Sequence, residues 1–176
     1  ADHAMLSFMD GYAGYNQIKM AKEVMSKTTF ITSWGTYCYT VMPFGLINAG
    51  ATYQRTATTL LHDMMHKEVE VYVDDMIVKS REREGHINNL RKFFTRIQKY
   101  NLRLNPAKCT FGVTSGKLLG YVISKRGIEV DPVKIKAITE MQPPKDLKGI
   151  RSFLGQAQYI YRYIAKLYMI CEPTFK

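Results

Sequence analysis

Glu70-Val71-Tyr72-Val73-Asp74-Asp75-Met76-Ile77-Val78 places two adjacent carboxylates between two short apolar runs rich in β-branched residues. Hydrophobic residues alternate before the pair and run unbroken after it, a pattern that predicts a β-hairpin with the acids at its tip. Two like charges about 4 Å apart repel by about 4 kcal/mol at an effective dielectric of about 20, so a nearby cation is expected. An ordinary turn is the alternative, because Asp is a common turn residue. Against that reading, Asp-Asp offers no glycine for the positive φ angles that two-residue hairpin turns prefer.

A third carboxylate, Asp10, ends the apolar segment 6–10 and is followed directly by Gly11. If its strand lies beside the hairpin in one sheet, Asp10 converges on Asp74 and Asp75. Three carboxylates supply the oxygen ligands that hard divalent cations such as Mg²⁺ prefer. Paired metals about 3.5–4 Å apart stabilise the attacking and leaving oxygens of phosphoryl transfer without a nucleophilic side chain. The sequence therefore favours a two-metal site, and we find no defensible Ser-His-Asp or Cys-His arrangement.

The charge of the chain indicates a polyanionic partner. The formal net charge is +10 at pH 7, and residues 79–126 hold twelve lysines or arginines against two glutamates. Phosphate contacts by such side chains dominate nucleic-acid affinity and make it dependent on salt. The alternative is a solvated helix face that keeps the protein soluble, which is the usual meaning of a charge run. The one-sided sign of this stretch favours nucleic acid.

Hydrophobic periodicity predicts a mixed α+β fold. Asn48 is expected to cap a helix that runs to about residue 66, and a second helix opens near Ser80. Two shorter helices are expected to begin at Asp131-Pro132 and at Asp146. The apolar stripe of the second helix is expected to comprise Ile87, Leu90, Phe94 and Ile97. The expected strands are 6–10, 28–32, 37–41, 69–73, 76–79, 117–123 and 127–130.

Composition narrows the class of protein. A chain of 176 residues with a hydrophobic share of 46% is long and apolar enough for one or two domains with a core. No apolar run approaches the roughly 20 residues needed to cross a bilayer, and no secretory leader opens the chain, so neither a membrane nor secretion is expected. The cysteines, Cys38, Cys109 and Cys171, are odd in number and widely spaced, which predicts a reduced intracellular compartment. Since the chain starts at Ala1, we expect it to be a truncated piece of a longer protein.

Five blocks of the sequence resemble reverse transcriptases, in the order in which that family carries them. Residues 72–75 resemble the Tyr-x-Asp-Asp box, and residues 8–18 resemble the box with the first catalytic aspartate. Residues 42–55 are similar to the nucleotide-pocket box, and residues 118–121, Leu-Leu-Gly-Tyr, are similar to the primer grip. Residues 151–164 resemble the segment beyond it in gypsy-class long-terminal-repeat retrotransposons. Because the ordered blocks span nearly the whole chain, it is identified as a truncated reverse transcriptase domain of a gypsy-class Pol polyprotein.

The resemblance implies a right-hand polymerase fold and RNA-directed DNA polymerase activity. The palm would comprise residues 1–17, with the first catalytic strand, and residues 48–124, with the hairpin and the primer grip. Residues 18–47 would form partial fingers, and residues 125–176 a helical thumb or connection segment. The implied partners are a primed RNA or DNA template, a deoxynucleoside triphosphate (dNTP), and the ribonuclease H, integrase and protease portions of a Pol polyprotein. The implied location is intracellular, in a cytoplasmic virus-like particle or the nucleus.

The resemblance also implies roles for individual residues. Asp10, Asp74 and Asp75 would be catalytic and would ligate two Mg²⁺ ions, for which Mn²⁺ could substitute, with help from the carbonyl of Gly11. The nucleotide-binding residues would be Tyr15, Phe44, Gly45, Gln54 and Val73. Tyr15 would exclude a ribose 2′-hydroxyl, although core packing is the alternative for this aromatic residue and for Phe44. The primer strand would be held by Leu118, Leu119, Gly120 and Tyr121.

Two other functions have support in the sequence. The segment 62–66, His-Asp-Met-Met-His, places two histidines at i and i+4 of a predicted helix, as in the His-Glu-x-x-His box of zinc proteases, with Asp63 as the base. No third ligand stands in a recognisable frame. The other alternative is a catalytically inactive, basic nucleic-acid-binding remnant of a retrotransposon. Only nine residues precede Asp10, where the family carries fingers that hold the triphosphate, so weak or absent extension by the isolated chain is expected.

Overall fold

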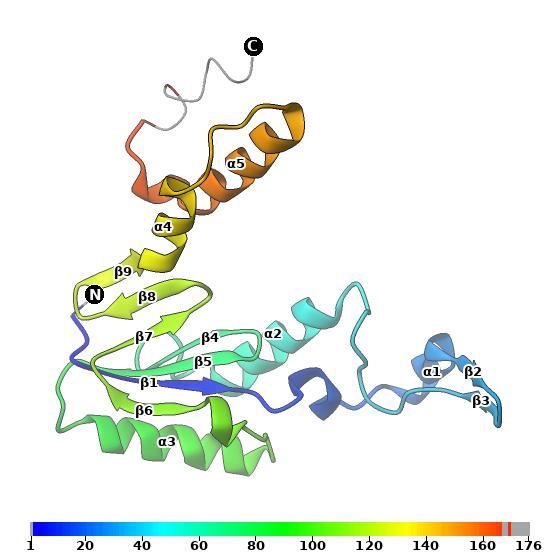
Figure 1. The fold of residues 1–176 in the computed structure, drawn as a ribbon. Helices are drawn as coiled ribbons and strands as arrows, with labels where there is room; N and C mark the ends of the chain where they lie inside the picture. The colour runs from blue at the N-terminus through cyan, green and yellow to red at the C-terminus, as the bar shows by residue number, and fades with distance from the viewer. Residues whose placement is uncertain (1, 167–168, 170–176) are drawn as a thin grey trace.

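The computed structural model describes residues 2–166 and 169, and its centre is a four-stranded antiparallel sheet (Figure 1). We call this the main sheet. Its strand order is β4 (Val69–Tyr72), β5 (Asp75–Ser80), β1 (Met5–Asp10) and β6 (Thr110–Val113). The predicted hairpin is confirmed, since β4 and β5 pair from Val69 opposite Val78 to Tyr72 opposite Asp75. Strand β6 was not predicted, because its mostly exposed residues carry no alternating pattern.

The two faces of the main sheet are covered by different elements. Helices α2 (Ala49–Leu61) and α3 (His86–Lys99) pack on one face, where Met9 and Met76 lie in the same buried cluster as Phe93. On the other face Phe8 and Ile77 form a second cluster with partly buried residues from later in the chain. Because successive side chains of a strand point to opposite faces, the central strands β1 and β5 carry apolar residues toward both clusters. This explains the unbroken apolar run after the acid pair.

A three-stranded antiparallel sheet covers the second face, with the order β7 (Ser115–Leu118), β8 (Tyr121–Ser124) and β9 (Gly127–Val130). We call this the small sheet. The prediction of one strand at 117–123 is wrong, because the chain turns back at Leu119 and Gly120, whose φ angles are +51° and +79°. Two positive φ angles at the centre of a two-residue loop match the right-handed twist of a hairpin. The turn was hidden inside an apolar run.

A second hairpin lies away from the main sheet, beyond the short 3₁₀-helix η1 (Gly14–Gln17), as Figure 1 shows. It consists of β2 (Phe30–Thr32) and β3 (Gly35–Tyr37), preceded by α1 (Lys22–Met25) and the 3₁₀-helix η2 (Ser26–Thr28). Strands were predicted here, but at 28–32 and 37–41, so their extents are wrong. An isolated two-stranded hairpin is only marginally stable in water, and the real strands are accordingly short.

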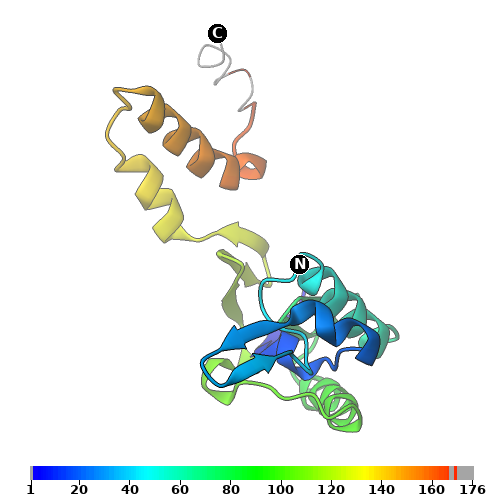
Figure 2. The same cartoon turned by 90° about the vertical axis from the view of Figure 1, so that its right-hand side faces the viewer.

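The C-terminal helices stand on the small sheet and extend away from the main sheet (Figure 2). Helix α4 (Pro132–Thr139) is capped by Asp131, which accepts a hydrogen bond from the Val133 amide at 3.1 Å. Helix α5 (Leu147–Tyr159) is capped by Asp146, which accepts from the Gly149 amide at 2.6 Å. Both predicted starts are therefore confirmed. A single 3₁₀ turn, η4 (Tyr161–Tyr163), follows α5, and Cys171 lies outside the described residues.

The two long helices differ from their predicted form. Helix α2 ends at Leu61 rather than near residue 66, and α3 begins at His86 rather than near Ser80. The predicted stripe on α3 is partly wrong, because Phe94 is 39% exposed whereas Phe93 is fully buried. The helix is turned so that polar His86 also faces the sheet, a position that a hydrophobic pattern does not mark. In the described part of the chain, no helix is long and apolar enough to span a membrane.

Candidate active site

The register of the main sheet brings the three acids together. In the antiparallel pairing of β1 with β5, Asp10 lies directly opposite Asp75. The backbone amide of Gly11 donates a hydrogen bond to the carbonyl oxygen of Asp74 at 2.8 Å, which fixes the chain after β1 against the hairpin tip. Directly opposed residues in such a pair are close neighbours on the sheet. The predicted adjacency of the Asp10 strand and the acid-tipped hairpin is therefore present.

The tip of the β4–β5 hairpin is strained. Its two central residues are Val73 and Asp74, and Val73 adopts a φ of +52°. A β-branched residue in the left-handed region is a genuine outlier, and such strain persists only where the surroundings impose it. Here the Gln54 side chain imposes it: its Oε1 accepts from the Val73 amide at 2.6 Å and its Nε2 donates to the Val71 carbonyl at 3.1 Å. Gln54, expected at the nucleotide, thus contacts the hairpin backbone.

Asp74 is the most constrained of the acids. Among the described residues, its Oδ1 is the one buried side-chain oxygen or nitrogen without a hydrogen-bond partner. A Cβ atom on Gly14 would overlap that oxygen, so the first residue of η1 approaches the carboxylate as closely as only glycine allows. Burial, followed by the charges of Asp10 and Asp75, raises the pKa of Asp74. A buried oxygen without a partner among clustered acids has the chemistry to accept a cation.

Lys108 supplies the positive charge at this site, and the sequence did not single it out. Its Nζ lies 3.3 Å from Oδ2 of Asp10, and it is placed there by the 3₁₀-helix η3 (Pro106–Lys108). The Asn105 amide also donates to the Asp10 carbonyl at 2.8 Å, so this segment is bound to the end of β1. Burial and Asp10 raise the pKa of Asp75, while Lys108 lowers it. Lys108 lies in a short irregular segment without a hydrophobic periodicity, so the sequence pattern could not predict its position beside Asp10.

The carboxylates suit a hard divalent cation by chemistry, although they are not drawn together as a ligand set. Within the described residues, no group of three or more His, Cys, Asp or Glu side chains is arranged so that it could hold a metal ion. Asp10 is paired with Lys108 at 3.3 Å. The orphaned oxygen of Asp74 and the raised pKa of its neighbour Asp75 nonetheless fit an incoming cation, which would relieve the repulsion.

A cluster of aromatic residues adjoins Asp74. The Tyr15 ring lies 5.0 Å from that of Phe44 and 5.8 Å from that of Tyr53, between ring centroids. Phe44 is 66% exposed, which core packing does not explain, and Gly45 follows it directly. Tyr53 is buried beside Asp74, and this burial, with the charge of Asp74, raises the pKa of its phenol to about 12. Tyr53 is one of the buried residues of α2, and the sequence did not single out its place beside the acids.

The predicted primer-grip residues form the tip of the β7–β8 hairpin. Leu118 and Tyr121 are its last paired residues, with Leu119 and Gly120 between them. Leu118 also packs against the cluster that contains Phe8 of β1. This tip is therefore connected through the small sheet to the strand that carries Asp10.

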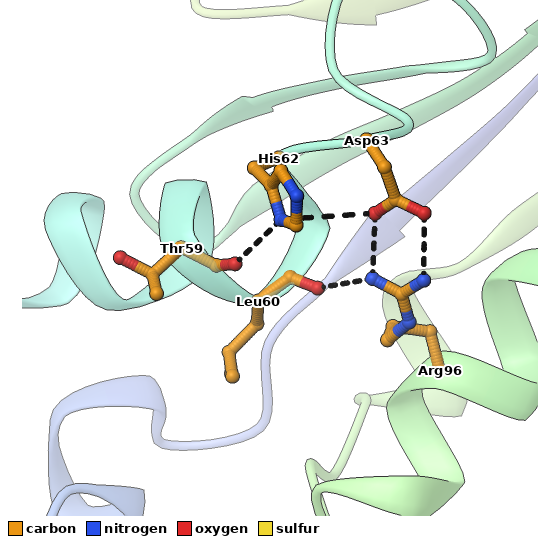
Figure 3. A network of polar contacts seen from close by, with 5 residues as sticks. All are labelled: Thr59, Leu60, His62, Asp63 and Arg96. Carbon is orange, nitrogen blue, oxygen red and sulfur yellow. Dashed lines mark hydrogen bonds and ion pairs between the residues drawn. The ribbon is translucent and has the colours of Figure 1, made fainter.

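The zinc-protease alternative is wrong, and Figure 3 shows the contacts that Asp63 makes instead. Helix α2 ends at Leu61, and His66 has a φ of +62°, so the two histidines do not lie on one helical face. Asp63, the required base, is held by the Arg96 guanidinium at 2.7 and 2.8 Å, and this contact lowers its pKa to about 2. His66 instead contacts Glu70 at 2.9 Å.

Comparisons with known proteins agree with this geometry. Residues 1–123 match the family described as reverse transcriptase (RNA-dependent DNA polymerase). The Pol polyprotein of transposon 297 from Drosophila melanogaster is 39% identical over 160 residues, which cover 91% of this chain and 15% of that protein. That of transposon gypsy, from the same fly, is 34% identical over 165 residues, covering 94% of this chain and 16% of that protein. The chain therefore spans well under a fifth of these relatives.

Solved structures show the same fold. A foamy viral protease–reverse transcriptase in complex with double-stranded DNA matches with a TM-score of 0.88 at 21% identity, over 98% of this chain and 30% of that one. The same kind of enzyme in complex with an RNA/DNA hybrid matches with a TM-score of 0.86 at 20% identity, over 99% of this chain and 24% of that one. Since the family match takes in β1, the strained hairpin and the acids that they bring together, this chain belongs to the reverse transcriptase family.

Proposed function

We propose that this chain is the polymerase core of a retrotransposon reverse transcriptase, which transfers a nucleotide from a dNTP to a primer 3′-hydroxyl on an RNA or DNA template. The observation that carries the proposal is the pairing of Asp10 with Asp75 across β1 and β5, with the buried, unpartnered Oδ1 of Asp74 beside them. In this proposal residues 1–17 and 48–124 are palm, 18–47 partial fingers and 125–166 the described part of a thumb.

The residues proposed to hold two Mg²⁺ ions, or Mn²⁺ in their place, are Asp10, Asp74 and Asp75, with the Gly11 carbonyl. When bound, the ions would lower the pKa of the primer hydroxyl and neutralise charge on the phosphates. Lys108 holds the Asp10 carboxylate at 3.3 Å and offsets part of the repulsion among the acids. Because Lys108 is itself 65% exposed, it is free to turn from Asp10 toward an anionic group.

The nucleotide pocket is proposed to lie at Tyr15, Phe44 and Gly45, beside the acids. The Tyr15 ring is fixed between Phe44 and Tyr53, so a ribose 2′-hydroxyl that met it would displace a packed aromatic group rather than a mobile side chain. Val73 would lie under the primer terminus, and Gln54 would act by holding the backbone of Val73 at 2.6 Å rather than by touching the nucleotide. Leu118 to Tyr121 would hold the primer strand. Lysines and arginines of residues 79–126 would contact phosphates.

Primer extension on poly-rA/oligo-dT with Mg²⁺ tests the proposal. Asp74→Asn and Asp10→Asn are expected to abolish extension and leave salt-sensitive primer–template binding largely intact, because the carboxylates serve the metals and the basic residues serve the phosphates. Asp63→Asn is the matched control, since Asp63 is exposed and pairs with Arg96 (Figure 3). If the variant that carries both Asp10→Asn and Asp74→Asn extends the primer at the parental rate, the site assignment is contradicted. Binding without extension by the parental chain would favour the inactive remnant.

A further inference from the structure

The tip of the β7–β8 hairpin has a second partner outside the small sheet. Tyr159, the last residue of α5, donates a hydrogen bond from its hydroxyl to the carbonyl of Leu119 at 2.6 Å. The two residues are 40 positions apart in the sequence. A backbone carbonyl at the tip of a turn normally faces water, so a buried or half-buried side chain that binds it fixes the tip in place.

The contact is reciprocal. Tyr121 of β8 donates its own hydroxyl to the backbone carbonyl of Tyr159 at 3.0 Å. The two rings are stacked, with centroids 5.0 Å apart and planes 12° from parallel. We call this arrangement the tyrosine pair. Two hydrogen bonds and a stacked ring pair hold the end of α5 against the hairpin more firmly than either hydrogen bond alone.

Gly120 adapts the hairpin to this pair. Its φ is +79°, and a Cβ atom there would overlap the Tyr159 hydroxyl and lie 3.1 Å from Cζ of the same ring. Both the backbone conformation and the space therefore require glycine. The corner after α5 is held as well, because Tyr163 donates to the Ile128 carbonyl of β9 at 3.1 Å.

The same hairpin reaches the catalytic strand on its other side. Leu118 packs against the cluster of Leu6, Phe8 and Ile77, and Phe8 lies two residues before Asp10 on β1. The hairpin tip thus lies between two fixed points, α5 through the tyrosine pair and β1 through this cluster. A change at either point would move the tip relative to the acids.

We propose that Tyr159 is a positioning residue for nucleotide transfer: its hydroxyl sets where the primer-grip tip holds the primer 3′ end relative to Asp10. This inference rests on the proposed function, since it assigns the tip to the primer strand. In this proposal the rate of extension also depends on α5, which acts through the hairpin tip rather than by direct contact with the acids.

Tyr159→Phe is the test, because it removes the hydroxyl and keeps the stacked ring. The single-turnover extension rate at saturating dNTP is expected to fall about tenfold, the effect of losing one hydrogen bond that positions a reacting group. The dissociation constant of primer–template is expected to stay within about twofold, because the phosphate contacts are unchanged. Tyr161→Phe is the matched control: this tyrosine lies two residues away, is 50% exposed and contacts Arg162. It is expected to extend at the parental rate.

A second variant separates positioning from loss of folding. Gly120→Ala meets the Tyr159 hydroxyl, so its effect on the rate should be smaller in the Tyr159→Phe background than in the parental chain. Simple addition of the two effects, or a Tyr159→Phe rate equal to that of Tyr161→Phe, would overturn the proposal. A third outcome would also overturn it. If Tyr159→Phe has a lower melting temperature and its rate loss disappears at lower temperature, the loss comes from unfolding rather than from positioning.

A primer with 2-aminopurine at its 3′ end keeps the test independent of catalysis. Tyr159→Phe is expected to change the fluorescence of the bound terminus, whereas Asp74→Asn and Tyr161→Phe are expected to leave it unchanged. If the parental chain binds primer–template but does not extend it, the proposed function fails and this signal still decides on Tyr159. An unchanged signal in Tyr159→Phe overturns the further inference alone.

Discussion

The tips of the β4–β5 and β7–β8 hairpins have similar turns but lie in different surroundings. Each is a two-residue turn with a bulky residue at a positive φ, +52° at Val73 and +51° at Leu119, and each is held by a side chain from a helix. The β4–β5 tip belongs to a sheet in which Val69 and Val78 are fully buried, whereas Leu119 is 47% exposed. The first tip is held by the Gln54 side chain and by the packing of Val73 against the main core, whereas the second tip is held by its hydrogen bond to Tyr159. We therefore expect the tip next to the acids to be more rigid than the β7–β8 tip.

The largest effect is expected from Gly14→Ala, which tests the rigidity of the first tip. The added methyl group would overlap the Asp74 carboxylate, and the packed surroundings leave that group little room to move. A displacement of about 1 Å at a reacting centre can reduce the rate about a hundredfold, so extension should fall by at least that factor. Primer extension measures it. Gly155→Ala is the control, since a Cβ atom there meets open space on α5. A mild effect of Gly14→Ala would mean that the catalytic tip is as adaptable as the other one.

Gln54→Leu breaks the support of the strained turn. It leaves the Val73 amide and the Val71 carbonyl without the partners that they have at 2.6 and 3.1 Å. Because half-buried polar groups that lose their partners destabilise a protein by about 1–3 kcal/mol, the free energy of unfolding should fall by about 2 kcal/mol. Urea unfolding followed by circular dichroism measures the change. Gln156→Leu, at an exposed position of α5, should leave stability within about 0.5 kcal/mol. Equal losses in the two variants would contradict the assigned role of Gln54.

The same substitution at both tips sharpens the comparison. Asn tolerates the left-handed region, so Leu119→Asn should raise the free energy of unfolding by about 0.5–1 kcal/mol. Val73→Asn should not, because Val73 packs against the main core and its replacement loses apolar contacts of comparable size. Paired urea titrations of the two variants check this. Stabilisation at both positions would show that packing contributes little at the catalytic tip.

Mild acid should weaken the main sheet before the small sheet. His86 is buried between the hydroxyls of Ser7 on β1 and Ser80 on β5, at 2.7 and 2.8 Å, and burial lowers its pKa. The unfolded chain then binds the proton more readily, so stability from neutral His86 is present above pH 6.5 and declines as the pH falls toward the folded-state pKa. Hydrogen exchange should show earlier loss of protection in β1 and β5 than in β8. His86→Gln should remove this pH dependence. An unchanged profile in that variant would rule His86 out as its source.

The sequence predicts those secondary-structure elements whose form is determined by residues close together in the chain. The alternation around the acid pair predicts the hairpin, and caps such as Asp131 and Asp146 predict helix starts, because the signal lies within a few residues. The site was predictable as far as the acids. Lys108 and Tyr53 escaped prediction, and Gln54 was predicted without its contact to the hairpin backbone, because these roles depend on contacts between segments far apart in the sequence. On α3, adjacent Phe93 and Phe94 gave two equally apolar registers, and only packing on the sheet chooses between them.

The outlying β2–β3 hairpin has a practical consequence for measurement. Trp34, the sole tryptophan of the chain, lies at its turn and is 87% exposed to solvent. Its indole is already in water in the folded protein, so its emission should scarcely shift when the main sheet melts. Tryptophan fluorescence would therefore report on the surroundings of the β2–β3 hairpin alone. It should change when a ligand or another protein segment covers Trp34.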